Sequence, residues 1–310
     1  MVRAAPVRPY SRVMRIAITG STGLIGSALS SRLSDDGHDV VPVVRGTPKD
    51  GEIAWSVDEN RIEDGAFDGI DAVVHLAGAP IGGSRWSEEY KREIMQSRTV
   101  GTAIVANAVN EASNPPSVLL SGSAMGYYGA SRTRTFDETS PKGDGFLADV
   151  CEAWEAAAAP ARIDGTRVVF LRTGIVLSKD GGALKKQLPL FKFGLGGKMG
   201  DGQQWQSWIS IDDEVGAIVH LLTSDVSGPV NLTAPNPVTN STFTDTLGDV
   251  LNRPTILPIP KFGPKLLLGE ELAENLLFTG QKVLPTVLEG DGYVFRHRDL
   301  ADALRAELGS

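Results

Sequence analysis

The sequence predicts an α/β protein, a doubly wound parallel sheet with a smaller, partly interleaved C-terminal α/β lobe. Runs of β-branched residues alternate with helical patterns, as in a parallel sheet that helices cover on both faces. A glycine-rich turn joins the first predicted strand to the first predicted helix. Past about residue 180, the predicted elements become short and prolines separate them, which indicates a second lobe.

The predicted elements follow the apolar patterns in chain order. Strands are predicted at 15–19, 40–44, 72–77, 117–121 and 167–171. Helices are predicted at 24–36, closed by Gly37, at 87–110 and at 146–159. Residues 51–69 have glycine at both ends and weak periodicity, so we expect a short strand and an irregular crossover there.

The composition limits the partners of the protein. A chain of 310 residues with 41% apolar and 22% charged residues can bury a large core. Its net charge of −8 and the lack of a basic stripe oppose nucleic-acid binding. The single cysteine excludes an internal disulfide and fits a reducing compartment, and no apolar run reaches the ~18 residues of a membrane span. We predict a cytoplasmic protein that binds neither nucleic acid nor membrane.

The stretch ITGSTGLIGS, residues 18–27, places three glycines where the first strand should become the first helix. After a strand that ends at Thr19, such a turn presents backbone amides and a helix N-terminus to a ligand. Gly20 can adopt a positive φ, Gly23 leaves room for close approach, and Gly26 lets the helix pack on the sheet. A dinucleotide pyrophosphate is the anion that fits this Rossmann-type turn. The alternative is a tight turn without a ligand.

The end of the second strand indicates which dinucleotide is bound. In NAD-preferring folds, an Asp or Glu about 20 residues beyond the glycines bonds the adenosine ribose. Residues 40–49 contain no acid and carry Arg45 at this point. A guanidinium can hold the 2′-phosphate of NADP with paired hydrogen bonds. The sequence therefore favours NADP(H); the alternative is an arginine that only faces solvent.

The glycine motif and the change of pattern divide the chain. Residues 14–180 are predicted as a dinucleotide-binding domain, to which segments at about 205–235 return. Residues 181–308 are predicted as a substrate-side lobe. Residues 1–13 carry three arginines and no acid and precede Met14, so they are a flexible arm or an over-called start.

Several motifs occur in the order of a known family: TGSTGLIG, HLAG (75–78), SGSAMGYYG (121–129), LRTGIVLSKDGGAL (171–184) and GDGQQWQSWISIDD (200–213). The chain resembles extended short-chain dehydrogenases/reductases, which include nucleotide-sugar epimerases and dehydratases. It is more similar to an atypical epimerase-like branch that ends in a domain of unknown function. That likeness rests on RW at 85–86, GYYG, LGGKMGDGQQWQSWI and TGQKVLPTVLEGDGYVF (279–295).

The resemblance spans about 14–308 and implies roles for particular residues. The backbone at 76–78 would run beside the adenosine ribose, and the backbone from Arg172 to Gly174 would pass near the nicotinamide. Ser123 corresponds to the family serine that hydrogen-bonds the reacting carbonyl or hydroxyl. The residues implied in cofactor binding are Thr19, Gly20, Thr22, Gly23, Leu24, Ile25, Gly26, Arg45, Leu76, Ala77, Gly78, Arg172 and Gly174.

The chain departs from the superfamily at the proton-transfer pair. Active members place a Tyr four residues before a Lys on the helix after the serine, and the Lys lowers the Tyr pKa. No Tyr-x-x-x-Lys occurs in this sequence. On the matching helix, Phe146 or Leu147 stands at the Tyr position and Val150 or Cys151 at the Lys position. The loss of a general acid/base typically costs ~100- to 10,000-fold in rate, so standard sugar epimerisation is in doubt.

Other side chains are candidate substitutes. Tyr127 and Tyr128 follow Ser123 at the end of a predicted strand, the edge where ligands bind in open α/β sheets. Either tyrosine can donate a proton or form an aromatic wall. Asp212 and Asp213 open a predicted helix, where an acid caps the helix and stabilises its dipole, or acts in catalysis.

The remaining reactive residues indicate no further site. Cys151 lies on an apolar helix face without a basic neighbour in sequence, which favours a core role over a nucleophile. His75 ends a buried-looking strand and is interpreted as a structural histidine. The histidines have no ligand spacing, so no metal site is expected.

The substrate side is predicted from aromatic and amide side chains. The glycine-rich segment 194–202 resembles a loop that lies over the substrate in sugar-nucleotide enzymes. Arg85, Trp86, Gln204 and Trp205 are the predicted substrate-binding residues, and the loop can equally be a lid without specificity of its own.

Two functional classes remain. One is an NADP(H)-dependent oxidoreductase or epimerase-like enzyme of a small molecule, for which Ser123, Tyr127 and Tyr128 are the catalytic candidates. The other is a catalytically silent NADP(H)-binding redox sensor or regulatory protein. In either class we expect a monomer or a homodimer.

Overall fold

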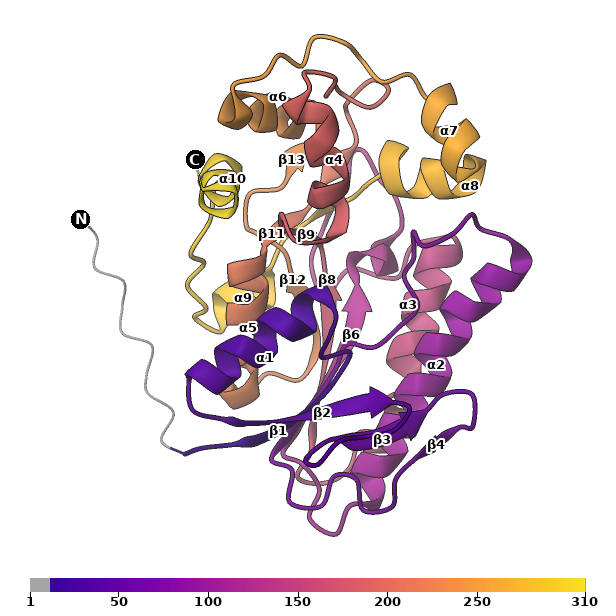
Figure 1. The fold of residues 1–310 in the computed structure, drawn as a ribbon, viewed down its shortest axis with the longest axis vertical. Coiled ribbons are helices and arrows are strands. Elements are labelled where there is room, and N and C mark those ends of the chain that lie inside the picture. Colours follow the sequence, from indigo (N-terminus) through magenta and orange to yellow (C-terminus); the bar gives the residue numbers. More distant parts are fainter. Residues whose placement is uncertain (1–11, 310) are drawn as a thin grey trace, which may run out of the picture.

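The computed structural model describes residues 12–309, so most of the predicted arm, residues 1–11, lies outside the described residues. Its centre is an eight-stranded sheet in the order β12-β8-β6-β5-β1-β2-β3-β4 (Figure 1). Neighbouring strands are parallel except β3 and β4. The strands are β1 (Arg15–Thr19), β2 (Asp39–Arg45), β3 (Ile53–Ser56), β4 (Arg61–Ile62), β5 (Ala72–His75), β6 (Val118–Ala124), β8 (Arg167–Thr173) and β12 (Gly228–Leu232).

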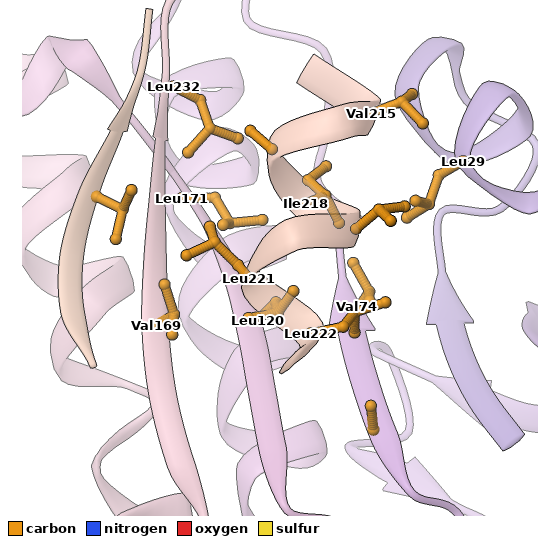
Figure 2. Packing of buried hydrophobic residues seen from close by; sticks show 14 of the residues in the cluster. Leu29, Val74, Leu120, Val169, Leu171, Val215, Ile218, Leu221, Leu222 and Leu232 are labelled. Atoms are coloured by element: carbon orange, nitrogen blue, oxygen red, sulfur yellow. The ribbon is translucent and has the colours of Figure 1, made fainter. Parts of the chain in front are cut away.

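Helices cover both faces of the sheet, because strand residues alternate between two cores. On β1, Ile16 and Ile18 join α1 (Leu24–Asp35) and α5 (Ile211–Thr223) in one core, which Figure 2 shows between α5 and the strands. Ala17 faces the opposite core with α2 (Glu88–Glu111), and α3 (Phe146–Ala156) packs beside α2. The doubly wound fold class is confirmed.

The predicted strands and helices of the first half are all present, with ends that shift by a few residues. The segment 51–69 holds the strands β3 and β4, where a single short strand was expected. Strand β5 ends at His75, two residues before the predicted end at Ala77. The strand ends there because the amides of Leu76 and Ala77 donate to the hydroxyl of Thr19 on the neighbouring strand β1.

The second half forms a smaller core of its own. The helices α4 (Gly182–Lys192), α6 (Asn240–Leu251) and α10 (Leu300–Leu308) pack together. The other elements are α7 (Phe262–Leu268), α8 (Glu270–Ala273), α9 (Thr286–Gly290) and the paired short strands β10 (Trp205–Gln206) with β13 (Val238–Thr239), β11 (Trp208–Ser210) with β9 (Ile175–Leu177), and β14 (Lys282–Val283) with β7 (Thr135–Phe136).

The C-terminal segment is anchored to the central domain through a buried carboxylate. Ser210 caps α5 by accepting the amide of Asp213, whose side chain is fully buried. The Asp213 carboxylate accepts the amides of Arg296 and His297 at 2.7 and 2.9 Å and the Tyr293 hydroxyl at 3.0 Å. Asp213 therefore attaches the last segment to α5, and its oxygens are occupied by these donors.

None of the described helices has the length and apolar character to cross a membrane.

Candidate functional site: a cleft at the sheet edge and a neighbouring polar network

The glycine turn folds tightly between β1 and α1. Gly20 has a φ of +69°, and a Cβ there would lie 3.1 Å from the Ala77 nitrogen. The amide of Gly23 donates to the Gly20 carbonyl at 2.9 Å, which closes the turn. A Cβ on Gly26 would lie 2.2 Å from that same carbonyl oxygen. Gly26 therefore lets α1 pack closely against the turn at the end of β1.

A cleft of about 1380 Å³ opens beside this turn along the carboxyl ends of β1, β2 and β5. The predicted cofactor residues that line it are Gly20, Thr22, Gly23, Arg45, Leu76, Ala77 and Gly78. Leu24, Ile25 and Gly26 follow directly as the first turn of α1. Arg172 and Gly174 lie at the end of β8, outside the lining of this cleft.

Arg45 is exposed at the end of β2 and lines the cleft, together with Lys49. Because β2 lies next to β1, with Val43 opposite Thr19, Arg45 projects beyond the level of the glycine turn. Four acids also line the cleft, Glu52, Asp58, Glu89 and Glu93, and the sequence carries no motif that marks them. The side chain of Glu52 accepts the amide of Lys49 at 2.9 Å.

Thr19 and His75 are buried side chains that support the backbone of the cleft. Thr19 is fully buried, and its hydroxyl accepts the amides of Leu76 and Ala77 at 3.1 and 3.2 Å. The same hydroxyl lies 2.7 Å from His75 Nδ1, and Thr102 lies 3.0 Å from Nε2. Burial, with a smaller contribution from Arg98, lowers the pKa of His75 to about 4, so the ring is neutral at pH 7. Thr19 therefore braces the backbone of the cleft from inside.

A second polar cluster lies at the ends of β6 and β8, where the serine was predicted. Ser123 donates to Glu155 Oε1 at 2.7 Å. Arg172 holds both oxygens of Glu155, from Nε at 2.8 Å and Nη2 at 2.9 Å. These side chains are nearly buried, with 4% of Arg172 and 12% of Glu155 exposed. Burial works to lower the pKa of Arg172, but Glu155 outweighs it and the pKa lies above its usual value.

This pairing fixes the direction of the Ser123 hydrogen bond. The Glu155 carboxylate accepts both arginine donors, and Ser123 donates its hydroxyl hydrogen to the same carboxylate. Ser123 then offers only lone pairs to a ligand. With its hydrogen directed at Glu155, Ser123 can accept a hydrogen bond from a substrate hydroxyl, whereas a substrate carbonyl could bond to it only if the serine hydroxyl turned away from Glu155.

The two tyrosines of GYYG occupy different surroundings. Tyr128 is 2% exposed, donates to Asn231 at 2.6 Å, and accepts from Arg172 at 3.0 Å. Burial raises the pKa of Tyr128 to about 12, although Arg172 acts to lower it. Tyr127 is half-buried, with the Arg172 guanidinium 3.5 Å from its ring centre. Tyr128 is an internal member of the network, and Tyr127 is the more accessible phenol.

Helix α3 has apolar side chains where the superfamily has its pair. Phe146 begins the helix and packs edge-on against Trp86 at 5.1 Å between ring centres. Val150 and Cys151 are buried. Burial raises the pKa of the Cys151 thiol to about 12, which makes it unreactive. Glu155, one turn further along, is the polar residue of α3 that the sequence reasoning missed.

The predicted substrate residues fall into two groups. Arg85 is exposed and donates to the carbonyls of Leu266 and Leu267 at the end of α7, so it links the loop before α2 to the second lobe. Trp86 covers Phe146, as described above. Gln204 and Trp205 form the second group. Gln204 contacts the glycine-rich loop at Met199, and Trp205 contacts the backbone of Arg132.

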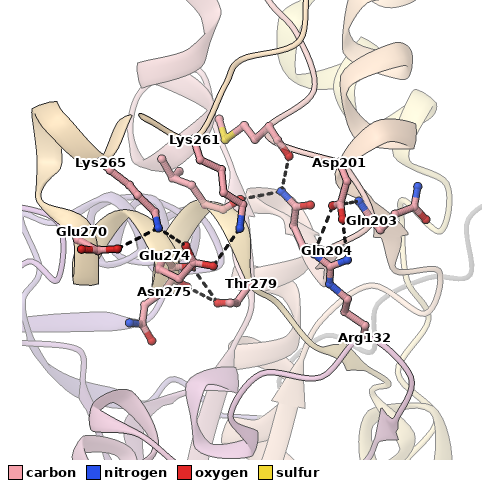
Figure 3. Close-up of polar contacts among 12 residues, drawn as sticks. Arg132, Asp201, Gln203, Gln204, Lys261, Lys265, Glu270, Glu274, Asn275 and Thr279 are labelled. Atoms are coloured by element: carbon pink, nitrogen blue, oxygen red, sulfur yellow. Dashed lines mark hydrogen bonds and ion pairs between the residues drawn. The ribbon is translucent and has the colours of Figure 1, made fainter. Parts of the chain in front are cut away.

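Gln204 and Trp205 make internal hydrogen bonds. Gln204 is 2% exposed and donates to the carbonyls of Met199 and Leu277, beside the Lys261 and Glu274 ion pair in Figure 3. Trp205 donates from its indole nitrogen to the Arg132 carbonyl at 3.0 Å. Within residues 12–309, no group of three or more His, Cys, Asp or Glu side chains is arranged to hold a metal ion.

The fold and the turn define a class, the Rossmann-type α/β proteins whose sheet edge is shaped for a dinucleotide. Residues 16–233 match the NAD dependent epimerase/dehydratase family, and residues 259–307 match a domain of unknown function, DUF1731. The chain belongs to this epimerase/dehydratase family, and the resemblance predicted from its motifs is confirmed.

Similar proteins match over nearly the full chain. An epimerase family protein of Mycobacterium leprae is 43% identical over 296 residues, which are 95% of each chain. A chloroplastic SDR39U1 homolog of Arabidopsis thaliana is 43% identical over 303 residues, 94% of this chain and 86% of the relative. The crystal structure of human epimerase family protein SDR39U1 with NADPH has a TM-score of 0.88 and 36% identity, and covers 96% of this chain and 100% of the human chain.

Proposed function

We propose that the protein binds NADP(H) and acts as an oxidoreductase or epimerase-like enzyme on a small molecule that presents a hydroxyl. The observation that supports this most strongly is the shared cleft of the glycine turn and Arg45. The turn offers amides and the α1 N-terminus to a pyrophosphate, and Arg45 offers a guanidinium to a 2′-phosphate. The similar human protein was crystallised with NADPH.

The residues present fit this cofactor. A Cβ on Gly23 would meet only the Gly20 carbonyl within 4 Å, so the outer side of the turn is open to a phosphate. The cleft volume of about 1380 Å³ exceeds the range of about 300–1,000 Å³ for pockets that bind drug-sized ligands, so a dinucleotide fits. When bound, the nicotinamide supplies a group that donates or accepts a hydride.

The chain's own residues then orient the reacting group. Ser123 accepts a hydrogen bond from the substrate hydroxyl, because its own hydroxyl hydrogen is donated to Glu155. Arg172 aligns the Glu155 carboxylate by its bidentate contact. Tyr127 lies beside Arg172 and is the accessible phenol of the site. The Trp86 and Phe146 pair presents an apolar surface at the start of α3.

A calorimetric titration with NADPH, NADP⁺, NADH and NAD⁺ tests cofactor binding. We expect tight binding of the phosphorylated pair and weak binding of the other pair. Equal affinities would contradict the role of Arg45, and no binding at all would contradict the proposed function. Enzymatic activity is then tested by mixing the NADP⁺ complex with a panel of alcohols and nucleotide sugars and following the formation of NADPH.

A second candidate is a protein that binds NADP(H) without catalysis and reports its redox state. The specific observation in its favour is the internal satisfaction of the polar network. Ser123, Glu155, Arg172 and Tyr128 bond to one another, and α3 carries no tyrosine or lysine. Under this function, NADPH and NADP⁺ differ in affinity and no member of the panel is oxidised.

We also infer a reducing compartment and a cytoplasmic location, which the single buried cysteine supports. A chloroplastic relative shows that this family is not restricted to one compartment. Fractionation of cells that express a tagged chain tests the location.

A further inference from the structure

Arg98 is a buried cation that neither the turn nor the Ser123 network uses. It lies on α2 and is 7% exposed. Its Nη1 donates to the carbonyls of Ala79 at 3.0 Å and Ile94 at 3.2 Å, and its guanidinium lies 4.9 Å from the ring centre of Trp154. No ion pair joins Arg98 to an acid among the residues that the structure describes. A buried charge without a counter-charge is costly, and a ligand with acceptor groups beside Arg98 would offset that cost.

The guanidinium lies against the backbone of Gly78 at the predicted cofactor edge, although Arg98 is not among the residues that line the cleft. A Cβ on Gly78 would lie 3.3 Å from Arg98 Cζ, and Gly78 lines the cleft. The positive charge also acts on Cys151 of α3, where it works against burial to lower the thiol pKa. Val150 or Cys151 stands where the superfamily has its lysine. A cation from α2 is therefore present where α3 itself supplies none.

The order of the strands indicates which part of a dinucleotide lies over Gly78. Arg45 ends β2, the glycine turn follows β1, Gly78 follows β5, and Ser123 lies on β6. These strands are adjacent in the order β6-β5-β1-β2. With the adenosine 2′-phosphate at Arg45 and the pyrophosphate at the turn, this order would bring the nicotinamide-side ribose over β5, in place of the adenosine ribose that the resemblance implies beside residues 76–78. This ribose exposes hydroxyls that can accept from a guanidinium.

We propose that Arg98 is a cofactor-binding residue whose Nε and Nη2 groups donate to the hydroxyls of the nicotinamide-side ribose. Nη1 is held by Ala79 and Ile94, which fixes the plane of the guanidinium, and no hydrogen bond from Nε or Nη2 is found within the described residues. This role depends on the proposed binding of NADP(H). It places a binding residue on α2, outside the glycine turn, Arg45 and the Ser123 network.

The test compares NADPH, 2′-phospho-ADP-ribose and 2′-phospho-ADP by calorimetry, since only the first two carry the second ribose. We expect Arg98→Met to weaken NADPH and 2′-phospho-ADP-ribose by roughly 10- to 100-fold and 2′-phospho-ADP by less than about two-fold, as for the loss of charge-assisted hydrogen bonds. Arg98→Lys should recover part of the loss. The ratio of affinities cancels any general effect on the fold, and thermal unfolding checks each variant.

Arg45→Glu serves as the matched control, because it should weaken all three ligands together. Equal weakening of the three ligands by Arg98→Met would assign Arg98 to bracing the Ala79 loop or to the pyrophosphate and would overturn the ribose contact. Unchanged affinity for NADPH would overturn it as well. If Arg98→Met does not fold, the same ratios measured with Arg98→Lys decide between these outcomes. A wild-type protein that binds none of the ligands contradicts the proposed function first, before Arg98 is in question.

Discussion

The two ends of the sheet edge differ in how their polar groups are satisfied. At the cleft beside β1 and β2, Arg45 is exposed and the outer side of the glycine turn is open. At the ends of β6 and β8, Ser123, Glu155 and Arg172 bond to one another and are nearly buried. A surface built for an anion keeps its donors open, because the ligand must replace water there. The second region has already paired its charges, so it can orient a group but has little free capacity to bind a charged one.

The largest expected effect is on stability, when the buried pair is broken. Glu155→Ala leaves Arg172 as an unpaired buried cation, and we expect the free energy of unfolding to fall by about 3–5 kcal/mol. Binding of 2′-phospho-ADP should stay within about two-fold, because this ligand uses the other region. Denaturant unfolding and calorimetry measure the two effects.

Two controls sharpen this comparison. Ser123→Ala removes one hydrogen bond to Glu155 and should cost about 1 kcal/mol. Arg132→Ala breaks the exposed pair with Asp201, half of each side chain being open to solvent, and should cost about 0–1 kcal/mol. A loss for Glu155→Ala as small as for Arg132→Ala would show that the cluster is not a buried unit.

The second effect is on affinity. Gly23→Val fills the outer side of the turn, and we expect it to weaken all four dinucleotides by roughly 100-fold or more, because phosphate oxygens must approach the backbone closely. The matched control is Gly263→Ala on α7, where an added Cβ meets nothing within 4 Å. Calorimetry measures binding, and circular dichroism verifies the fold. Retained affinity would remove the turn from the binding surface.

The third effect separates the cofactors. Arg45→Glu should weaken NADPH by roughly 10- to 100-fold and NADH by much less, because only NADPH places a 2′-phosphate against this side chain. Equal losses for NADPH and NADH would mean that Arg45 acts on the general potential of the cleft.

The smallest effect is a pH dependence of stability, which comes from an acid in contact with the end of β8. Glu214 on α5 is fully buried and accepts the Thr173 hydroxyl at 2.9 Å. Burial raises its pKa from 4.5 to about 8. Between these values the unfolded chain releases a proton that the folded chain keeps, so this group makes stability fall as pH rises from about 4.5 to 8.

Glu214→Gln should remove that fall. Between about pH 5 and pH 7.5, we expect the unfolding free energy of the wild type to decrease by more than about 1 kcal/mol relative to that of the variant, since one pKa unit corresponds to about 1.4 kcal/mol. Urea unfolding at both pH values measures it. A difference that does not change with pH would show that Glu214 ionises alike in both states.

The structure also shows why some residue roles escape a sequence. Asp212 and Asp213 open a helix, and the sequence leaves both capping and catalysis open. Only the folded chain brings Arg296 and His297, more than 80 positions away, onto the Asp213 carboxylate. Arg85 carries no signal that it bonds the end of α7, about 181 positions later. Pairs of this kind depend on how separate elements pack.

The sequence by itself determined the elements of the first half, the glycine turn, the place of Arg45 and the missing Tyr-x-x-x-Lys. These are local properties, because period, turn chemistry and motif spacing depend on neighbours along the chain. The tertiary structure alone decided that Ser123 donates a hydrogen bond to Glu155, 32 positions away, and that Arg98 lies against Gly78. Such contacts form only when the register of β6 and β8 and the packing of α2 and α3 are set, since each requires atoms from separate elements within a few ångströms.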